Sequence, residues 1–526
     1  LHYPLRRQRQ MCIRDRYKTF SVIMLTGLSL GSVNCTGDYI GDVENIGSFD
    51  DVNYFKTEDQ CLSATASVYD KMKKYAGGFE NMVTFFNAGS DDFYSGGGSS
   101  TDGAGIQGFN NYTINPIIMP ASYWKDFYQG VANANWVLER MPDAPVSENF
   151  KKRIIAEVTV LRSLYYFELV KMFGNVPLIL KRISSNDDYW NIPQTPKQEV
   201  YNQIENDILA VVNDLPMTVG GAENGRITQG AARAILGKIY LYDKKNTEAA
   251  AQFAQVNGTP GQTSQYGYKL VDNYNKLFEL SEVSPGKYEY NKFTSESVLE
   301  AVYTNAGMSD WSFWGQGKDE GNSICIMTGP RSYNLASGST APDIVSGWAF
   351  NTLSDNLFNF MQNDPRAEAT ILNAKKLQSE GKITYSPAYA DTGYFLKKYA
   401  PFRKGVSDLP GSMELNFRQN YIVIRLADSY LMEAEALGGT GARAQALLDA
   451  VRARVGLPSV PVSMQAIKDE RRKELAGEGH RWFDLVRWGD APSALSFKGF
   501  VTNKNEVLPI PYSELLNTAL KQNQNY

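Results

Sequence analysis

The chain has 526 residues, 43% hydrophobic and 21% charged, so it is long enough for two or three domains or for a helical-repeat body. Its formal net charge is only −4, from 53 basic and 57 acidic residues, which excludes the one-sign field that would hold nucleic acid. His480 is the one histidine beyond the leader, which excludes His-dependent triads and His-ligated zinc but leaves carboxylate-pair hydrolysis open.

The N-terminal residues are typical of an export signal. Residues 1–16 are basic and patternless, and their end resembles translated sequencing-adapter text, so we expect them to be non-native. The apolar run from Phe20 to Leu30 is too short to span a bilayer but suits the core of a signal peptide. Cys35 follows where a bacterial lipoprotein would be cleaved and diacylated. We therefore predict a leader and signal peptide over 1–34 and a lipidated tether over 35–54; the alternative is a secretory signal that ends near a cysteine.

Apolar residues recur at spacings of three and four in the strongest segments of the body, which predicts amphipathic helices. The apolar stripes lie over residues 154–172, 232–239, 423–437, 444–455 and 467–475. Thr228 and Ser463 are candidate N-caps for the second and fifth of these helices. Short Gly-containing turns join several of the helices as pairs, which is typical of tetratricopeptide-like stacking. We therefore predict a mainly α fold, a tetratricopeptide-like helical superhelix.

Two long irregular regions interrupt the helices. One covers residues 87–120 and contains the small residues 96–100, and the other covers 258–412 and is rich in Gly, Ser, Asn and aromatic residues. Loops of this length are usually functional surfaces, and tryptophans among glycines argue against disorder. We predict an N-terminal helical region over 55–257 and a C-terminal region over 258–526, in which the loop-rich insert 258–412 carries the ligand site.

Four segments of the body together resemble the SusD/RagB family. In order they are LRSLYYFELV followed by FGNVPL (161–178), GRIT leading into AARAILGKIYLY (225–242), IRLADSYLMEAE (424–435), and ERRKEL followed by EGHRWFDLVR (470–487). Each segment alone is common in helices, but their order and spacing extend the resemblance over nearly the whole mature chain. The two regions predicted above are accordingly the N-terminal SusD-like region and the C-terminal SusD/RagB region.

The resemblance implies a fold and a function. The fold is a body of tetratricopeptide-like helix pairs with a loop-rich ligand site. The function is that of an outward-facing lipoprotein of the outer membrane, anchored through Cys35, which acts with a SusC-type TonB-dependent transporter in nutrient uptake. The family binds glycans in most described cases and peptides in some. It implies no catalysis and no cofactor.

The fourth segment carries charges that alternate in sign, with Asp469 and Lys473 one helical turn apart. A nucleic-acid surface would not interleave glutamates with its basic residues in this way. We interpret the segment as a salt-bridged network that holds one helix pair against the next, with Trp482 buried behind it. His480 has no nucleophile or metal-type partner nearby in sequence and is interpreted as a packing residue.

Aromatic residues in the Gly-rich loops are the candidate ligand contacts, because the core explains a tryptophan on a repeat helix but not one in such a loop. Aromatic rings stack on the C–H faces of pyranose rings, while amides and carboxylates bind the hydroxyl groups. In order of preference the candidates are Trp311, Phe313 and Trp314, then Asp92, Phe93 and Tyr94, and then Arg331, Tyr333 and Trp348. The alternative for each is that it only packs within the insert or contacts the transporter.

Two other functions stay open at this point. Asp91 and Asp92 leave room for an extracellular glycan-active hydrolase that uses loop carboxylates. A protein-binding helical adaptor that takes up no nutrient is the third possibility. EF-hand spacing is absent around the Asp pair, and we predict no metal. Cys61 and Cys325 lack CxxC spacing and are expected to be buried free thiols rather than a disulfide.

Overall fold

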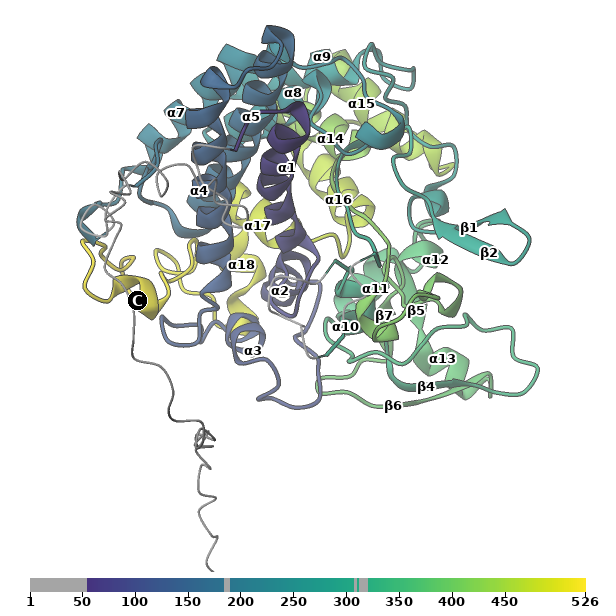
Figure 1. Ribbon diagram of the computed structural model, residues 1–526. Helices are drawn as coiled ribbons and strands as arrows, with labels where there is room; N and C mark the ends of the chain where they lie inside the picture. The colour runs from purple at the N-terminus through teal and green to yellow at the C-terminus, as the bar shows by residue number, and fades with distance from the viewer. Residues whose placement is uncertain (1–53, 184–189, 307–309, 312–319) are drawn as a thin grey trace, which may run out of the picture. The chain divides into compact units, whose positions relative to one another are not determined.

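The structure is a computed structural model that describes residues 54–183, 190–306, 310–311 and 320–526 (Figure 1). The part up to residue 257 is built from helices. In chain order they are α1 (Glu58–Tyr69), α2 (Met82–Gly89), α3 (Ala104–Asn110), α4 (Ser122–Arg140), α5 (Glu148–Phe173), α7 (Lys197–Val211), α8 (Gln229–Tyr242) and α9 (Asn246–Asn257). Helix α4 packs on α5, α5 on α7, and α8 on α9, so neighbours in sequence are neighbours in space.

The C-terminal helices continue this stack. They are α14 (Leu426–Ala436), α15 (Gly441–Arg454), α16 (Met464–Glu474), α17 (Arg481–Trp488), α18 (Ala491–Ala494) and α19 (Tyr512–Leu515). Helix α14 packs on α9, α15 and α16, and Figure 1 shows α14, α15 and α16 in yellow-green beside the blue and teal N-terminal helices. One apolar core runs through both sets of helices. The prediction of a mainly α fold with stacked helix pairs is therefore confirmed.

Local sequence signals explain where several helices begin. The Thr228 side chain accepts a hydrogen bond from Ala231 N at 3.2 Å, and the Ser463 side chain accepts one from Ala466 N at 3.1 Å, as the cap predictions required. The helix predicted from residue 423 begins later than expected. Val423 lies in a strand, because consecutive buried residues there pair with a partner strand before α14 starts.

In the described residues the insert contains short helices and all strands but β8, which follows it, of four two-stranded antiparallel sheets, β1–β2, β3–β8, β4–β6 and β5–β7. The helices are α10 (Ile324–Thr328), α11 (Asp355–Met361), α12 (Ala367–Thr370) and α13 (Ala374–Ser379). The strands are β1 (Leu280–Ser284), β2 (Lys287–Tyr290), β3 (Ser297–Ala301), β4 (Arg331–Leu335), β5 (Ile371–Asn373), β6 (Ile383–Ser386), β7 (Tyr394–Leu396) and β8 (Tyr421–Arg425). Pairing of Ala301 with Tyr421 closes the segment between them, which is thereby anchored on the helical body.

A set of ion-paired side chains, here called the charged seam, joins the insert to α15 and α16. Its members are at most 3% exposed and are Arg366, Lys398, Arg425, Arg454, Glu474 and Glu478. Glu474 lies 2.7 Å from Arg366 Nη1 and 2.5 Å from Arg425 Nη1, and it also pairs with Arg454. Burial alone would raise the pKa of Glu474, but the guanidinium groups, with Arg454 first, lower it well below the usual range.

The charged seam confirms the structural interpretation of the fourth segment, with one correction. Trp482 is fully buried, as predicted. The predicted pair of Asp469 with Lys473 is not the one formed, since Lys473 Nζ lies 3.7 Å from Asp364 Oδ2, on the insert. Tertiary packing thus supplies a buried partner that is closer to Lys473 than the half-buried acid one turn away. Burial lowers the pKa of His480 to about 4, so it is neutral at pH 7.

Two further predictions concern the cysteines and the membrane. Cys61 and Cys325 are both free and buried, as expected. Burial raises the pKa of the Cys325 thiol, which makes it unreactive. No helix in the described ranges is long and apolar enough to cross a bilayer. Cys35, the predicted lipidation site, lies outside the described residues.

Candidate functional site

The carboxylates of Asp91 and Asp92, which follow α2, are held by arginines of the C-terminal helices. Asp92 is 1% exposed and lies 2.6 Å from Arg472 Nη2, while Asp91 lies 2.8 Å from Arg481 Nε. Burial raises the pKa of Asp92, whereas at Asp91 the effect of burial is exceeded by that of Arg481 and Arg472 together, which lowers the pKa. Because Asp92 has almost no accessible surface in this conformation, the prediction that it contacts a ligand is corrected: its role is an interior ion pair.

Two of the predicted aromatic contacts are also interior residues. Phe93 is 1% exposed and forms a β-bridge with Leu353. Tyr333 is 2% exposed and donates a hydrogen bond from its hydroxyl to Pro342 O at 2.8 Å, within the small core of the insert. A ring without accessible surface cannot stack on a sugar, so both predictions are corrected. Tyr94 is half-buried and stays a candidate.

Three rings from distant parts of the sequence come together at the surface, and we call Phe79, Trp311 and Trp348 the aromatic platform. Trp311 is 50% exposed, and its ring centre lies 5.7 Å from that of Trp348 at an interplanar angle of 32°. The ring centre of Phe79 lies 6.3 Å from that of Trp348, at an interplanar angle of 39°. Phe313 and Trp314, predicted with Trp311, lie outside the described residues.

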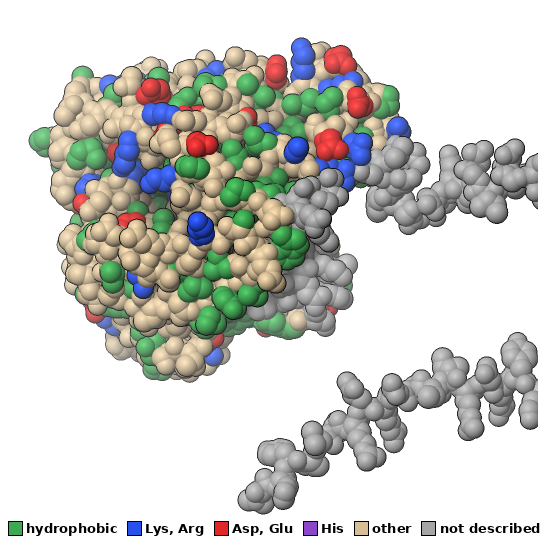
Figure 2. Space-filling view, turned by 90° about the vertical axis from the view of Figure 1, so that its left-hand side faces the viewer, with side chains coloured by type: hydrophobic (Ala, Val, Ile, Leu, Met, Phe, Trp, Pro, Cys, Tyr) green, Lys and Arg blue, Asp and Glu red, His purple; other side chains and the backbone are tan. Residues whose placement is uncertain are grey.

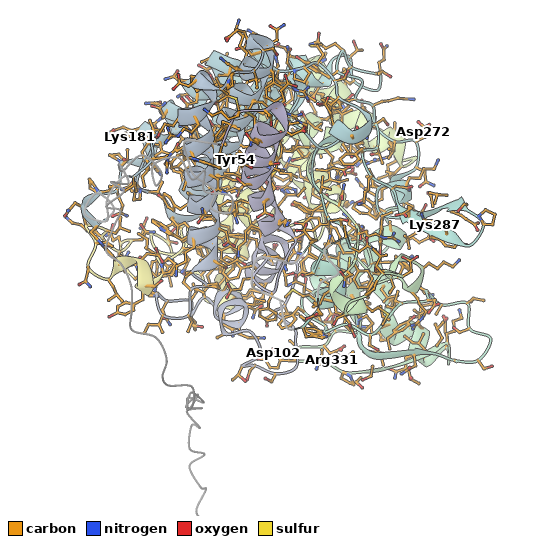
Figure 3. All side chains as sticks on the ribbon, viewed as in Figure 1. Tyr54, Asp102, Lys181, Asp272, Lys287 and Arg331 are labelled. Carbon is orange, nitrogen blue, oxygen red and sulfur yellow. The ribbon has the colours of Figure 1, made fainter. Side chains whose placement is uncertain are left out.

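Charged groups border the platform. Arg331 Nη1 donates to Trp348 O at 3.2 Å, and Asp102 Oδ2 accepts from Gly98 N at 2.7 Å. A Cβ built on Gly98 would lie 3.2 Å from both Arg331 Nη1 and Asp102 Oδ2, so the two charged groups flank the same glycine. Figure 3 shows Asp102 and Arg331 next to each other at one edge of the molecule.

The glycine run is explained by how closely this loop approaches the insert. Gly96 has φ +66°, and a Cβ there would lie 2.1 Å from Ala349 O, so only glycine fits. Gly97 N donates to the same Ala349 oxygen at 2.8 Å. The loop is thus fixed against the backbone next to Trp348, which positions Asp102 beside the platform.

The sequence interpretation found part of this site and missed part of it. Trp311, Trp348 and Arg331 were candidates, whereas Phe79 and Asp102 were not. Phe79 follows two glycines, so the signal that selected Trp311, an aromatic residue among small residues in a loop, also marks Phe79. Asp102 carries no such signal, because acidic residues are common on solvated loops.

The platform and its borders suit the binding of a neutral sugar chain. Neighbouring rings present flat apolar faces, and the guanidinium and carboxylate groups beside them can donate to and accept from hydroxyl groups. Among the residues that the structure describes, no three His, Cys, Asp or Glu side chains are grouped as a metal site would require. On the face shown in Figure 2, acidic and basic side chains are interspersed, so no field of one sign is seen there.

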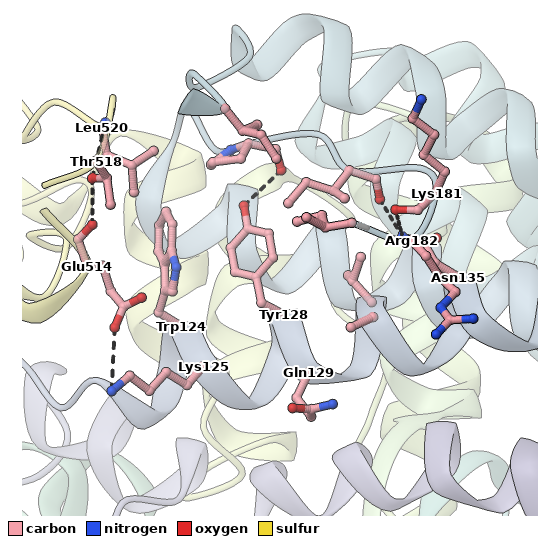
Figure 4. A pocket seen from close by; sticks show the side chains of 16 residues that line it. Trp124, Lys125, Tyr128, Gln129, Asn135, Lys181, Arg182, Glu514, Thr518 and Leu520 are labelled. Atoms are coloured by element: carbon pink, nitrogen blue, oxygen red, sulfur yellow. Dashed lines mark hydrogen bonds and ion pairs between the residues drawn. The ribbon is translucent and has the colours of Figure 1, made fainter. Parts of the chain in front are cut away.

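A separate cavity of about 480 Å³ lies between α4, the segment that follows α5, and the C-terminal segment (Figure 4). Two polar groups in its wall are bonded to the protein's own backbone. Tyr128 donates from its hydroxyl to Pro177 O at 2.8 Å, and Asn135 Nδ2 donates to Ile179 O at 2.8 Å. These groups stabilise the wall rather than present themselves to a ligand, and we assign none to this cavity.

Comparisons with known proteins agree with this architecture. Residues 234–526 match the model described as the SusD family, and residues 58–241 match one described as starch-binding and associating with the outer membrane. A SusD-like protein of Formosa agariphila is 24% identical over 521 residues, covering 88% of this chain and 90% of its own length.

Solved structures are similar along nearly the whole chain. A laminarin-binding SusD-like protein has a TM-score of 0.86 and 56% identity, covering 90% of this chain and all of its own. The surface glycan-binding protein A from Bacteroides thetaiotaomicron, solved in complex with laminarihexaose, has a TM-score of 0.76 and 25% identity, covering 88% of this chain and 99% of its own. Since one family model alone matches more than half of the residues, this chain belongs to the SusD family.

Proposed function

We propose that this protein binds a β-glucan of the laminarin type at the bacterial surface and delivers it for import. The observation that carries the proposal is the 56% identity, over 90% of the chain, with a protein described as laminarin-binding. The relative solved with laminarihexaose supports the same class of ligand. Laminarin is an uncharged glucan, so its recognition depends on stacking and hydrogen bonds rather than on a net charge of the protein.

The aromatic platform is the proposed binding surface. Trp311 offers a half-exposed ring, and the tilted rings of Trp348 and Phe79 extend the apolar surface beside it. Arg331 and Asp102 are placed to hydrogen-bond the hydroxyl groups at the edges of the sugar rings. Phe313 and Trp314 remain candidates because they adjoin Trp311 in sequence.

The proposed location is the outer face of the outer membrane, where a diacylated Cys35 would anchor the protein. The family description that associates the N-terminal match with the outer membrane supports this location. A SusC-type TonB-dependent transporter is the proposed partner, since a binding protein fixed at the surface needs a channel to take its ligand further.

Binding without hydrolysis is the favoured activity. The relatives are named for binding. The acidic pair behind the hydrolase alternative is occupied by arginines, and the ion pair of Asp92 is buried. A carboxylate in that setting cannot reach a glycosidic bond without local unfolding.

Calorimetric titration of the purified protein with laminarin tests the proposal. We expect Trp311→Ala to weaken laminarin binding about tenfold, because an aromatic contact contributes about 1 kcal/mol or more. Phe497→Ala is the matched control, since Phe497 is 62% exposed and lies on the 3₁₀ turn Ser496–Lys498, which contributes no residue to the platform. The control should bind like the wild type.

Three outcomes would contradict the proposal. One is a folded wild-type protein that binds no laminarin while binding a peptide pool. A second is an equal loss in Trp311→Ala and Phe497→Ala. The third is release of reducing ends from laminarin that Asp92→Asn abolishes, which would support the hydrolase.

The anchor is tested separately in cells. Cys35→Ser should move the protein from the outer-membrane fraction to a soluble fraction, because the variant cannot carry the acyl chains. The experiment is done with the transporter gene deleted, so that protein–protein contact does not retain the variant. A variant that stays in the membrane fraction would show that another element holds it.

A further inference from the structure

We infer that the glucan-binding site continues from the aromatic platform into a neighbouring cavity, in which a further part of the same sugar chain binds. This inference rests on the proposed function. The cavity, here called the side cavity, has a volume of about 630 Å³, within the range of about 300–1,000 Å³ found for small-molecule sites. Its walls come from residues 79–85, 103–106, 116–123 and 511–516.

The side cavity and the platform share a wall. Phe79 belongs to the platform through its contact with Trp348, and it also lines the side cavity. Gly103, another lining residue, allows this arrangement, because a Cβ there would lie 2.9 Å from Phe79 Cζ. The next residue, Glu80, lines the cavity as well. A chain that stacks along the platform and passes Phe79 therefore enters the side cavity directly.

The lining of the side cavity combines apolar faces with hydrogen-bonding groups, as a sugar site requires. Tyr512 is 53% exposed, Leu516 46% and Ile117 81%, so its rim is apolar and accessible. The Glu80 carboxylate accepts from Ser122 Oγ through Oε2. A carboxylate has four acceptor positions, so Glu80 retains acceptor capacity for a sugar hydroxyl.

The walls are held in place without a ligand. Tyr512 N donates to Pro116 O at 2.8 Å, which joins α19 to the loop before α4. On the other side, a Cβ on Gly105 would lie 2.6 Å from Pro120 Cγ, so α3 packs directly on that loop. A site formed in advance loses little conformational entropy on binding, which favours its use by a flexible polysaccharide.

A glucan chain is the occupant that these observations favour. A polymer longer than the platform must leave it at one end, and at the Phe79 end the side cavity offers an exposed tyrosine ring and a carboxylate. A protein partner such as the transporter needs no such continuity with the sugar-binding rings. It is therefore treated as an alternative that the experiment separates.

The test compares a short and a long ligand. Wild type, Tyr512→Ala and Tyr512→Ala/Leu516→Ala are titrated with laminaritriose and laminarihexaose, with Phe497→Ala as the exposed-aromatic control. We expect Tyr512→Ala to weaken laminarihexaose binding about fivefold, with a larger loss in the double variant. Laminaritriose, which the platform alone can hold, should bind to all four proteins with equal affinity.

Each other outcome overturns the inference. The outcomes also show whether the proposed function has failed or only the assignment of the side cavity. If both ligands bind the variants as they bind the wild type, the side cavity is not a sugar site, although the platform still is. If the variants keep their sugar affinity but no longer copurify with the transporter, the cavity is a protein interface. If both ligands weaken equally, Tyr512 acts on the platform itself. If the wild type binds neither ligand, the proposed function has failed first.

Discussion

The charged seam and the aromatic platform have opposite relations to solvent. Glu474 and Arg425 are at most 1% exposed and pair with each other, whereas Trp311 is half-exposed beside a second tryptophan. Charges placed in the interior have to be paired, so they define how the insert attaches to the helices. The Trp311 ring keeps half of its surface accessible, and this is the surface that we propose for the ligand. Charged and aromatic residues that stand out in the sequence can therefore have either role. The buried ones stabilise the fold, and the exposed ones are candidates for binding a ligand.

The largest effect should follow from breaking the charged seam. Glu474→Gln removes the charge that three buried guanidinium groups share. Each guanidinium keeps another carboxylate partner, but three buried ion pairs are weakened at once, and breaking a buried pair costs about 3–5 kcal/mol. We expect a decrease of that size in the free energy of unfolding, measured by urea denaturation.

Asp469→Asn is the control for that change, since Asp469 lies on the same helix and its carboxylate bonds only an exposed partner, Gln465. It should cost under about 0.5 kcal/mol. Equal losses in the two variants would show that helix α16, rather than the charged seam, is sensitive to neutralisation.

A pH effect of intermediate size should come from Lys398. Burial and repulsion from Arg425 lower the pKa of Lys398 to about 8, although attraction to Glu478 opposes this change. In the unfolded chain the pKa of a lysine is about 10.4. Between these values the unfolded state binds more protons, so the stability of the wild type should rise with pH relative to Lys398→Met. The full difference is about 3 kcal/mol, measured by urea denaturation between pH 7.5 and 10.5.

Lys397→Met controls for the loss of a lysine at the same place in the chain, because Lys397 Nζ bonds Glu368 O at an exposed position. Its stability should follow that of the wild type across the pH range. A constant difference between the wild type and Lys398→Met would instead mean that Lys398 stays charged in the folded protein.

Asp92→Asn tests whether the interior acidic pair Asp91–Asp92, like the charged seam, stabilises the fold rather than binds a ligand. The substitution weakens a charge-assisted contact with Arg472, so we expect a loss of about 1.5–3 kcal/mol in unfolding free energy. Laminarin affinity should not change. The exposed acid Asp355, replaced by Asn, is the control and should have little effect on either quantity. A stable Asp92→Asn protein with lost binding would return this residue to the ligand site.

The smallest effect on stability is expected at the platform. Trp311→Ala should change the free energy of unfolding by less than about 0.5 kcal/mol, because the ring is half-exposed. The same variant should lose laminarin affinity in calorimetry. If its stability falls by several kcal/mol, the ring supports the insert, and the contrast between the two regions does not hold.

Local sequence patterns were sufficient for many of the helices. Thr228 and Ser463 cap helices where their side chains predicted it, since a cap depends only on the next three residues. The strand at Val423 was not recognised, because an apolar run of that kind also fits a helix until its partner strand is known. Part of the platform, Trp311 and Trp348, was selected because aromatic residues in Gly-rich loops are not explained by a helical core.

Only the tertiary structure decided which loop residues are buried. Asp92 meets Arg472, 380 residues away, and no periodicity in the sequence reports a contact of that range. For the same reason Phe93 and Tyr333 were taken for surface rings, and Phe79 was not joined to Trp348. The sequence by itself determined the helices and the family resemblance, because these rest on short-range spacing and on the order of motifs. Exposure of each loop side chain depends on the segments that pack over it, and these come from distant parts of the chain.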